Sequence, residues 1–74
     1  MGRLARLPSR KVLHAPESFG FEAIRQRGSH IVMRHPDGRT TVVPIHTGED
    51  IGRGLLRKII RDARLDVEEF LRHV

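Results

Sequence analysis

Hydrophobic positions near the start of the chain recur with a helical period. Behind Ser9, a potential N-cap, the segment RKVLHAPESF predicts a short helix. Its apolar residues near one helical face are Val12, Leu13 and Phe19. Pro16 removes one backbone hydrogen bond and its ring clashes with the preceding turn, so we expect a kink or an early end near His14–Ala15. Gly20 then supplies a C-terminal stop.

From Phe21 the pattern changes to extended structure in three runs, FEAIRQ, HIVMRH and TTVVPIH. The turn signals RGS and PDG separate these runs, which predicts an antiparallel meander. The PDG turn is a strong hairpin signal, because Pro36 pre-sets the first turn position and Gly38 accepts a positive φ. Pro44 cannot donate to a strand ladder, so its strand lies at a sheet edge or is bulged at its end.

Alternation along the second run predicts which side chains face the helices. His30, Val32 and Arg34 share one face, and the opposite face carries Ile31, Met33 and His35. The second set contains the more apolar pair, so we expect His30 and Arg34 to point away from the helices. If the PDG turn pairs His35 with Arg39, His30 lies opposite Pro44, and His46 lies diagonal to it on the same face at roughly 7–8 Å.

The pattern after the glycine-rich segment HTGEDIGRG returns to a helical period in RGLLRKIIRDAR. The predicted core face of this helix carries Leu55, Leu56, Ile59, Ile60 and Ala63. The opposite side, within an arc of roughly 80°, carries Arg53, Arg57, Arg61 and Arg64. Asp66 stands three residues before Glu69, which resembles a capping box and predicts a last short helix that packs Val67, Phe70 and Leu71.

These elements predict one small α+β domain over residues 1–74. Helices cover one face of a three-stranded antiparallel sheet, a short helix ends the chain, and the other face of the sheet meets solvent. The apolar runs are far too short to span a membrane, and the N-terminus lacks the apolar middle of a secretory signal, so we expect a soluble cytoplasmic protein without a membrane partner.

Composition narrows the chemistry further. The chain has no cysteine, which excludes thiol nucleophiles and cysteine-based metal sites. Fourteen Lys and Arg against nine Asp and Glu give a net charge of +5. Most of these cations are arginine, the better bidentate partner for phosphate, so nucleic acid is the first partner to consider. An arginine-rich composition is equally typical of a hot or GC-rich source genome, and composition alone leaves that choice open.

Several short motifs together resemble a known family. They are LPS before the first helix, GF, RQRGSHIVMRHPDG through the hairpin, VVPIH in the third strand, and GRGLLRKII in the second helix. From about Leu7 to Leu71 the chain resembles the HicA toxins, also called the YcfA-like family, of bacterial and archaeal toxin–antitoxin pairs. Two positions depart from the family pattern: Pro16 stands where an apolar helix residue is usual, and Arg64 replaces a glycine.

The resemblance implies a double-stranded-RNA-binding-like fold and a toxin that cleaves mRNA, stops translation and is held inactive by a HicB-like antitoxin. It also implies that the histidine of the GSH element, His30 here, is tied to activity. Taken from the bare sequence, a histidine at a strand end is more often structural than catalytic.

Cleavage of RNA without a metal needs a base for the 2′-hydroxyl, a proton donor for the leaving 5′-oxygen, and cations beside the phosphoryl oxygens. Histidine suits the proton transfers because its ordinary pKa of about 6.5 lies near neutral pH. The candidate RNA-binding residues around His30 are Arg25, Arg27, Ser29, Arg34 and His46. Each has a plainer interpretation: the arginines as solvated strand charges, Ser29 as a turn hydroxyl, and His46 as a residue that ends a strand.

The sequence therefore supports a metal-independent endoribonuclease without a cofactor, acting on single-stranded stretches of mRNA. The remaining histidines, His14, His35 and His73, fit no zinc spacing, so we expect no metal site. The alternative is a non-catalytic double-stranded-RNA-binding module of the same fold. A third possibility is a protein-interaction domain with an acidic partner. With three Phe and no Tyr or Trp, the chain lacks the aromatic platform of other RNA readers.

Overall fold

The computed structural model describes residues 4–46 and 48–74 and confirms an α+β architecture. In chain order the elements are β1 (Leu7–Pro8), α1 (Ser9–Ser18), β2 (Glu22–Arg27), β3 (His30–Arg34), β4 (Thr40–Pro44), β5 (Asp50–Ile51), α2 (Arg53–Ala63) and α3 (Val67–Arg72). The predicted helix, three-stranded meander, second helix and short last helix are all present.

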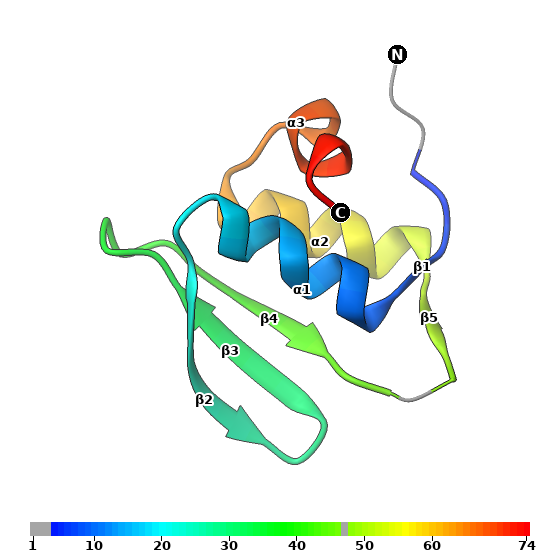
Figure 1. The fold of residues 1–74 in the computed structure, drawn as a ribbon, viewed down its shortest axis with the longest axis horizontal. Helices are drawn as coiled ribbons and strands as arrows, with labels where there is room; N and C mark the ends of the chain where they lie inside the picture. The colour runs from blue at the N-terminus through cyan, green and yellow to red at the C-terminus, as the bar shows by residue number, and fades with distance from the viewer. Residues whose placement is uncertain (1–3, 47) are drawn as a thin grey trace.

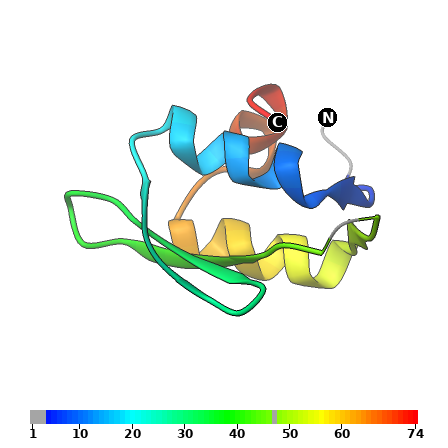
Figure 2. The ribbon, with the colours of Figure 1, turned by 60° about the horizontal axis from the view of Figure 1, so that its bottom comes forward.

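The helices form one layer and the three-stranded sheet the other. In both ribbon views α1 and α2 run alongside each other, the β2–β3 hairpin extends away from them, and α3 lies on the side of the helices away from the sheet (Figures 1 and 2). The strand order is β2-β3-β4, with both pairs antiparallel. Every residue of β2 is exposed, because this edge strand lies beyond the cover of the helices.

The core lies between α1, α2, α3 and the inner face of the sheet. Its buried hydrophobic residues are Val12, Ala15, Phe21, Met33, Val43, Ile51, Leu56, Ile59, Ile60, Ala63 and Phe70. Thr41 is buried among them, and its hydroxyl donates to the Ile59 carbonyl at 3.1 Å, so that no hydrogen-bonding capacity is lost there. The threonine thereby links β4 to α2.

The predicted register of the hairpin is confirmed. The His35 N–H donates to the Arg39 carbonyl at 2.9 Å, and His30 pairs with Pro44 across β3 and β4. Met33 is buried and Ile31 partly buried on the helix side, whereas His30 and Arg34 are exposed on the other. Pro44 ends β4, which is an edge strand, as its missing N–H requires.

The prediction that α1 kinks or ends near His14–Ala15 is wrong. The helix continues through Pro16 to Ser18. Pro16 lies in the last turn, so it costs only one hydrogen bond, and its ring is fully buried in the core. The helix then ends as expected at Gly20, which has φ +96° and donates to the Glu17 carbonyl at 3.0 Å.

Ser9 is not the N-cap of this helix. Pro8 occupies that position without a side-chain cap, and Ser9 is the first helical residue. The Ser9 hydroxyl instead accepts a hydrogen bond at 3.4 Å from the backbone N–H of His46, at the far end of the sheet. The serine therefore joins α1 to the segment that follows β4.

Leu55 was predicted to belong to the core face of α2, but its side chain is 42% exposed. The helix packs mainly against β4, and its line of contact passes through Leu56, Ile59, Ile60 and Ala63. Leu55 lies at the margin of that line, beside the outer face of the sheet. The predicted arginine side of α2 is exposed along its whole length.

The end of α2 and the start of α3 are capped in different ways. Arg64 ends α2 in the left-handed conformation, with φ 55°, the backbone geometry that favours glycine. Asp66 caps α3 as predicted, because its carboxylate accepts from the backbone N–H groups of Glu68 and Glu69 at 3.1 and 3.4 Å.

The glycine-rich connection before α2 contains a strand that the sequence did not predict. β5 pairs with β1, with Leu7 opposite Ile51. These two-residue strands come from segments more than forty positions apart, and neither carries a recognisable alternating pattern. Their pairing holds the approach to α1 beside the approach to α2.

Arg39 fastens the β3–β4 turn to the helices. Its guanidinium donates to the Asp37 carboxylate and to the Ala63 carbonyl, each at 2.8 Å, and lies 5.2 Å from the centre of the Phe21 ring. Its backbone N–H also donates to Asp37, and these hydrogen bonds hold the pKa of the Asp37 carboxyl below its ordinary value of 3.8. The turn is therefore a fixed end of the sheet.

Candidate active site

His30 stands directly after a two-residue turn. Arg27 and His30 are paired residues of β2 and β3, and Gly28 and Ser29 form the loop between them. Gly28 has φ +56°, as the first loop residue of a type II′ hairpin requires, and a Cβ there would meet no atom within 4 Å. The turn therefore presents His30 at an open end of the sheet, where its side chain is exposed.

A β-bulge brings the predicted arginines to the face that carries His30. The pairing of β2 with β3 shifts by one residue between Ala23 and Arg25. Arg25 then lies opposite Val32, and Arg27 opposite His30. Without the extra residue, alternation would place Arg25 opposite Ile31, on the face toward the helices. The bulge therefore puts both arginines on the outer face of the sheet.

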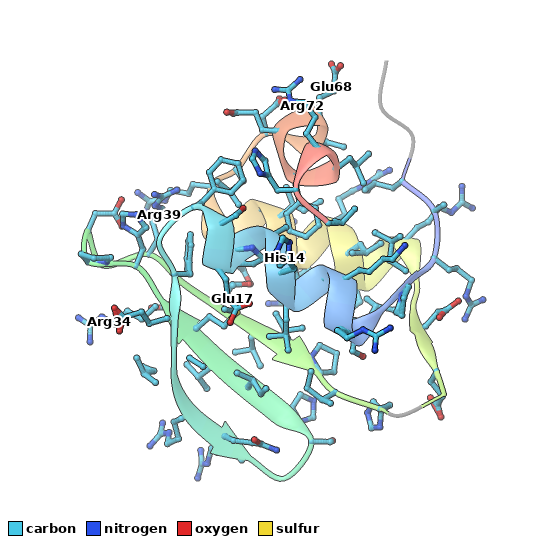
Figure 3. All side chains as sticks on the ribbon, in the orientation of Figure 1. His14, Glu17, Arg34, Arg39, Glu68 and Arg72 are labelled. Atoms are coloured by element: carbon cyan, nitrogen blue, oxygen red, sulfur yellow. The ribbon has the colours of Figure 1, made fainter. Side chains whose placement is uncertain are left out.

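Arg34 completes this basic face from β3. It is exposed, two pleats from His30 on the same side of the strand, and it extends outward from the sheet (Figure 3). Among the described residues, Arg25, Arg27 and Arg34 form no ion pair. We call these three arginines and His30 the outer-face cluster. Its charges are available to an anionic ligand.

The side of α2 borders the outer face next to His30. A hollow there is lined by His30, Val42, Pro44, Leu55, Lys58, Ile59 and Asp62. Val42 and Leu55 are 40% and 42% exposed, so the floor is partly apolar. Lys58 and Asp62 form an ion pair at 2.8 Å across one turn of the helix at its rim.

A second hollow adjoins the first at the start of α2. It is lined by Ser9, His30, Pro44, His46, Glu49, Asp50, Ile51, Gly52 and Leu55. His30 and His46 therefore open onto the same space. Gly52 is the N-cap of α2 and has no side chain to accept from the first N–H groups of that helix, and no other side chain among the described residues caps them.

The structure thus brings most predicted site residues together. Arg25, Arg27, His30 and Arg34 share the outer face, and His46 shares a hollow with His30. Ser29 is partly buried in the turn, where its backbone carbonyl accepts the Ile45 N–H. Its hydroxyl forms no hydrogen bond within the described part of the chain, so the turn does not depend on it.

Sequence reasoning missed the residues that enclose the two hollows. Glu49 and Asp50 were assigned no role, Leu55 was placed in the core, and Lys58 and Asp62 were not considered. The acidic residues inside the glycine-rich connection HTGEDIGRG were the available sign that this connection contributes to a site. Because they are far from His30 in the sequence, their closeness to His30 in the fold could not be predicted.

Two further findings concern groups of side chains that could bind a metal and helices that could span a membrane. Within residues 4–46 and 48–74, no group of three His, Asp or Glu side chains is placed to share a metal ion. In the same part of the chain, no helix has the length and apolar character needed to cross a membrane.

Comparison with known proteins extends these observations. The family model described as HicA toxin of bacterial toxin–antitoxin matches residues 9–65, which contain the sheet, both hollows and the whole of α2. No curated protein matched the chain.

Proposed function

The chain belongs to the HicA toxin family of toxin–antitoxin systems, and on this premise we propose that it is an endoribonuclease that cleaves mRNA and thereby inhibits translation. In this proposal His30 transfers a proton in the transition state, and the arginines of the outer-face cluster bind the phosphates on either side of the scissile bond. No metal or other cofactor takes part.

The observation that carries the proposal is the outer-face cluster itself. One exposed imidazole shares the outer face of the sheet with three exposed guanidinium groups, none of which forms an ion pair with a described residue. Such a face suits a single RNA strand, whose backbone is flexible and whose phosphates need cations at intervals. A buried cleft would instead favour a small substrate.

The chemistry requires little beyond these groups. Attack of the 2′-oxygen on the adjacent phosphorus needs a base, departure of the 5′-oxygen needs an acid, and the phosphoryl oxygens need cationic or N–H donors. Arg27, directly opposite His30, is the nearest such cation in the ladder. The N–H groups at the start of α2 lie beside the same hollow.

The partner of a toxin in such a system is its antitoxin. We propose a HicB-like protein that covers the outer face of the sheet and presents carboxylates to Arg25, Arg27 and Arg34. Complementary charge speeds capture, and coverage of His30 inhibits sterically. Both the RNA and the antitoxin then use one face, so binding of one excludes the other.

Substitution His30→Ala tests the proposal. We expect RNA cleavage to fall by roughly 10²–10⁴-fold, the usual contribution of a general acid or base, and toxicity to disappear. The thermal midpoint stays near that of the parent, because the His30 side chain is exposed and makes no hydrogen bond within the described residues. His14→Ala is the control for cleavage, since His14 is an exposed histidine on α1 (Figure 3); its ring bonds the His73 carbonyl at 2.8 Å, so this variant should lose some stability but no activity.

The products and the metal requirement are measured in the same assay. Attack by the 2′-oxygen predicts ends with a 2′,3′-cyclic phosphate and a 5′-hydroxyl, and cleavage persists in a chelator. Cleavage by the His30 variant at the parent rate, or activity lost on chelation and restored by magnesium, would overturn the mechanism. Binding of duplex RNA without cleavage by the parent protein would identify a non-catalytic double-stranded-RNA-binding module instead.

A further inference from the structure

His46 is a second exposed histidine in the hollow that His30 lines. Its ring makes no hydrogen bond within the described part of the chain, and it packs against no other aromatic ring there. A structural histidine usually has such partners. In this protein His14 bonds the His73 carbonyl at 2.8 Å, and His35 lies against the Phe21 ring.

The backbone, not the imidazole, places His46 in this position. The Ile45 N–H donates to the Ser29 carbonyl, so the residues directly before His46 and His30 are bonded to each other. The His46 N–H donates to the Ser9 hydroxyl at 3.4 Å. β4 ends at Pro44, which pairs with His30, and the bond from Ile45 to Ser29 continues the antiparallel pattern by one residue. If alternation holds to the next residue, His46 lies diagonal to His30 on the same face, at roughly the 7–8 Å expected of diagonal neighbours.

The charges around the hollow differ between its two sides. Glu49 and Asp50 line it next to His46, whereas Arg27 lies opposite His30 in the sheet. Lys58 and Asp62, at the rim beyond His30, neutralise each other. Arg10 also lies beside His46, in an adjoining hollow that Glu49 and Asp50 share. Carboxylates are therefore found on the His46 side of the hollow, and the arginine paired with His30 lies on the other side.

We propose that the hollow between β4 and the start of α2 holds the scissile phosphodiester, and that His30 and His46 are its general base and general acid. This inference rests on the proposed ribonuclease function. An acid and a base on separate residues can act in one step on opposite sides of the phosphorus. A single imidazole must first accept the proton of the 2′-hydroxyl and only then donate a proton to the 5′-oxygen.

The step balances without any other reactant. Neutral His30 takes the proton of the 2′-hydroxyl while the 2′-oxygen forms a bond to phosphorus. The bond from phosphorus to the 5′-oxygen breaks, its electron pair stays on that oxygen, and protonated His46 donates the proton that makes it a hydroxyl. The products are a 2′,3′-cyclic phosphate and a 5′-hydroxyl, and the two histidines regain their starting states by proton exchange with water.

A substrate with a sulfur leaving group distinguishes the role of the general acid from that of the general base. Once the parent protein's cleavage position in an RNA oligonucleotide is mapped, the same oligonucleotide is made with sulfur in place of the bridging 5′-oxygen at that position. A thiolate leaves without protonation. We expect His46→Ala to cleave ordinary RNA roughly 10²–10⁴-fold more slowly than the parent and the sulfur substrate at nearly the parent rate. His30→Ala, which lacks the base, is slow on both substrates.

His46→Gln is the control for a role in binding alone. Glutamine retains a hydrogen-bond donor for phosphate but cannot donate a proton as imidazolium does, so it should share the defect of His46→Ala and its rescue by sulfur. Cleavage of ordinary RNA by either His46 variant at the parent rate overturns the role of His46, as does an equal defect on both substrates. If His30→Ala is also fully active, or if the parent cuts no RNA, the proposed function fails as well.

Discussion

At the scale of single residues, Arg27 is the cation most directly coupled to His30, because the two are cross-strand partners. Substitution Arg27→Ala should weaken RNA binding and lower the slope of log affinity against log salt by about 0.7, the value for one phosphate contact on a single strand. Binding is measured across a salt series in the His30→Ala background, so that the RNA stays intact.

Arg72→Ala is the matched control for Arg27, since Arg72 is an exposed arginine on α3, away from the sheet (Figure 3). Its removal lowers the net charge equally but should leave the salt slope unchanged. Equal effects of the two substitutions would show that net charge matters and that the position opposite His30 does not.

At the scale of elements, the residue that ends α2 has a strained backbone conformation that one substitution should relieve. Arg64 has φ 55°, a conformation that costs a residue with a Cβ roughly 1–2 kcal/mol and glycine almost nothing. Glycine loses more conformational entropy on folding than arginine does, and this loss offsets part of the relieved strain. Arg64→Gly should therefore raise the free energy of unfolding by about 1 kcal/mol. Urea denaturation measures the change.

Arg57→Gly serves as the opposing control. Arg57 is exposed in the middle of the same helix, so the lost charge is the same, but glycine in a helix interior lowers stability by about 1 kcal/mol. A destabilised Arg64→Gly variant would mean that the arginine makes contacts that outweigh its backbone strain. RNA cleavage should be unaffected by either change, because both positions lie away from the outer-face cluster.

At the scale of the whole molecule, two groups of arginines form separate surfaces, the outer-face cluster and the arginine side of α2. At 100° per residue, Leu55, which lines both hollows, lies roughly 160° around α2 from Arg57. The arginine side of α2 and the outer-face cluster therefore face different directions, and one compact partner cannot cover both. The proposed antitoxin covers the cluster.

Charge reversal distinguishes the two surfaces. Arg25→Glu combined with Arg34→Glu should raise the dissociation constant of the toxin–antitoxin complex at least tenfold, because like charges replace opposite ones; antitoxin binding is measured directly, since both arginines also serve the RNA. Arg57→Glu combined with Arg61→Glu alters the net charge identically on the arginine side of α2 and should leave antitoxin binding intact. The reverse result, or an antitoxin footprint confined to α3, would contradict this placement.

The sequence by itself determined the three helices, the three-stranded meander, the hairpin register and the inner face of the sheet. These depend on neighbours within a few positions: the PDG turn sets which residues of β3 and β4 meet, and alternation then places His30 outside and Met33 inside. The cap at Asp66 and the stop at Gly20 are local for the same reason. The family resemblance over much of the chain is likewise carried by short motifs.

Only the tertiary structure decided how these pieces make a site. The bulge after Ala23 turned Arg25 and Arg27 toward the face of His30. Periodicity alone does not reveal one extra residue in an edge strand whose residues are all exposed. Pro16 was tolerated because the core buries its ring. Glu49 and Asp50 reached His30 because β5 pairs with β1, and α2 packs along β4. Such long-range contacts follow from packing of the whole chain, which no local pattern encodes.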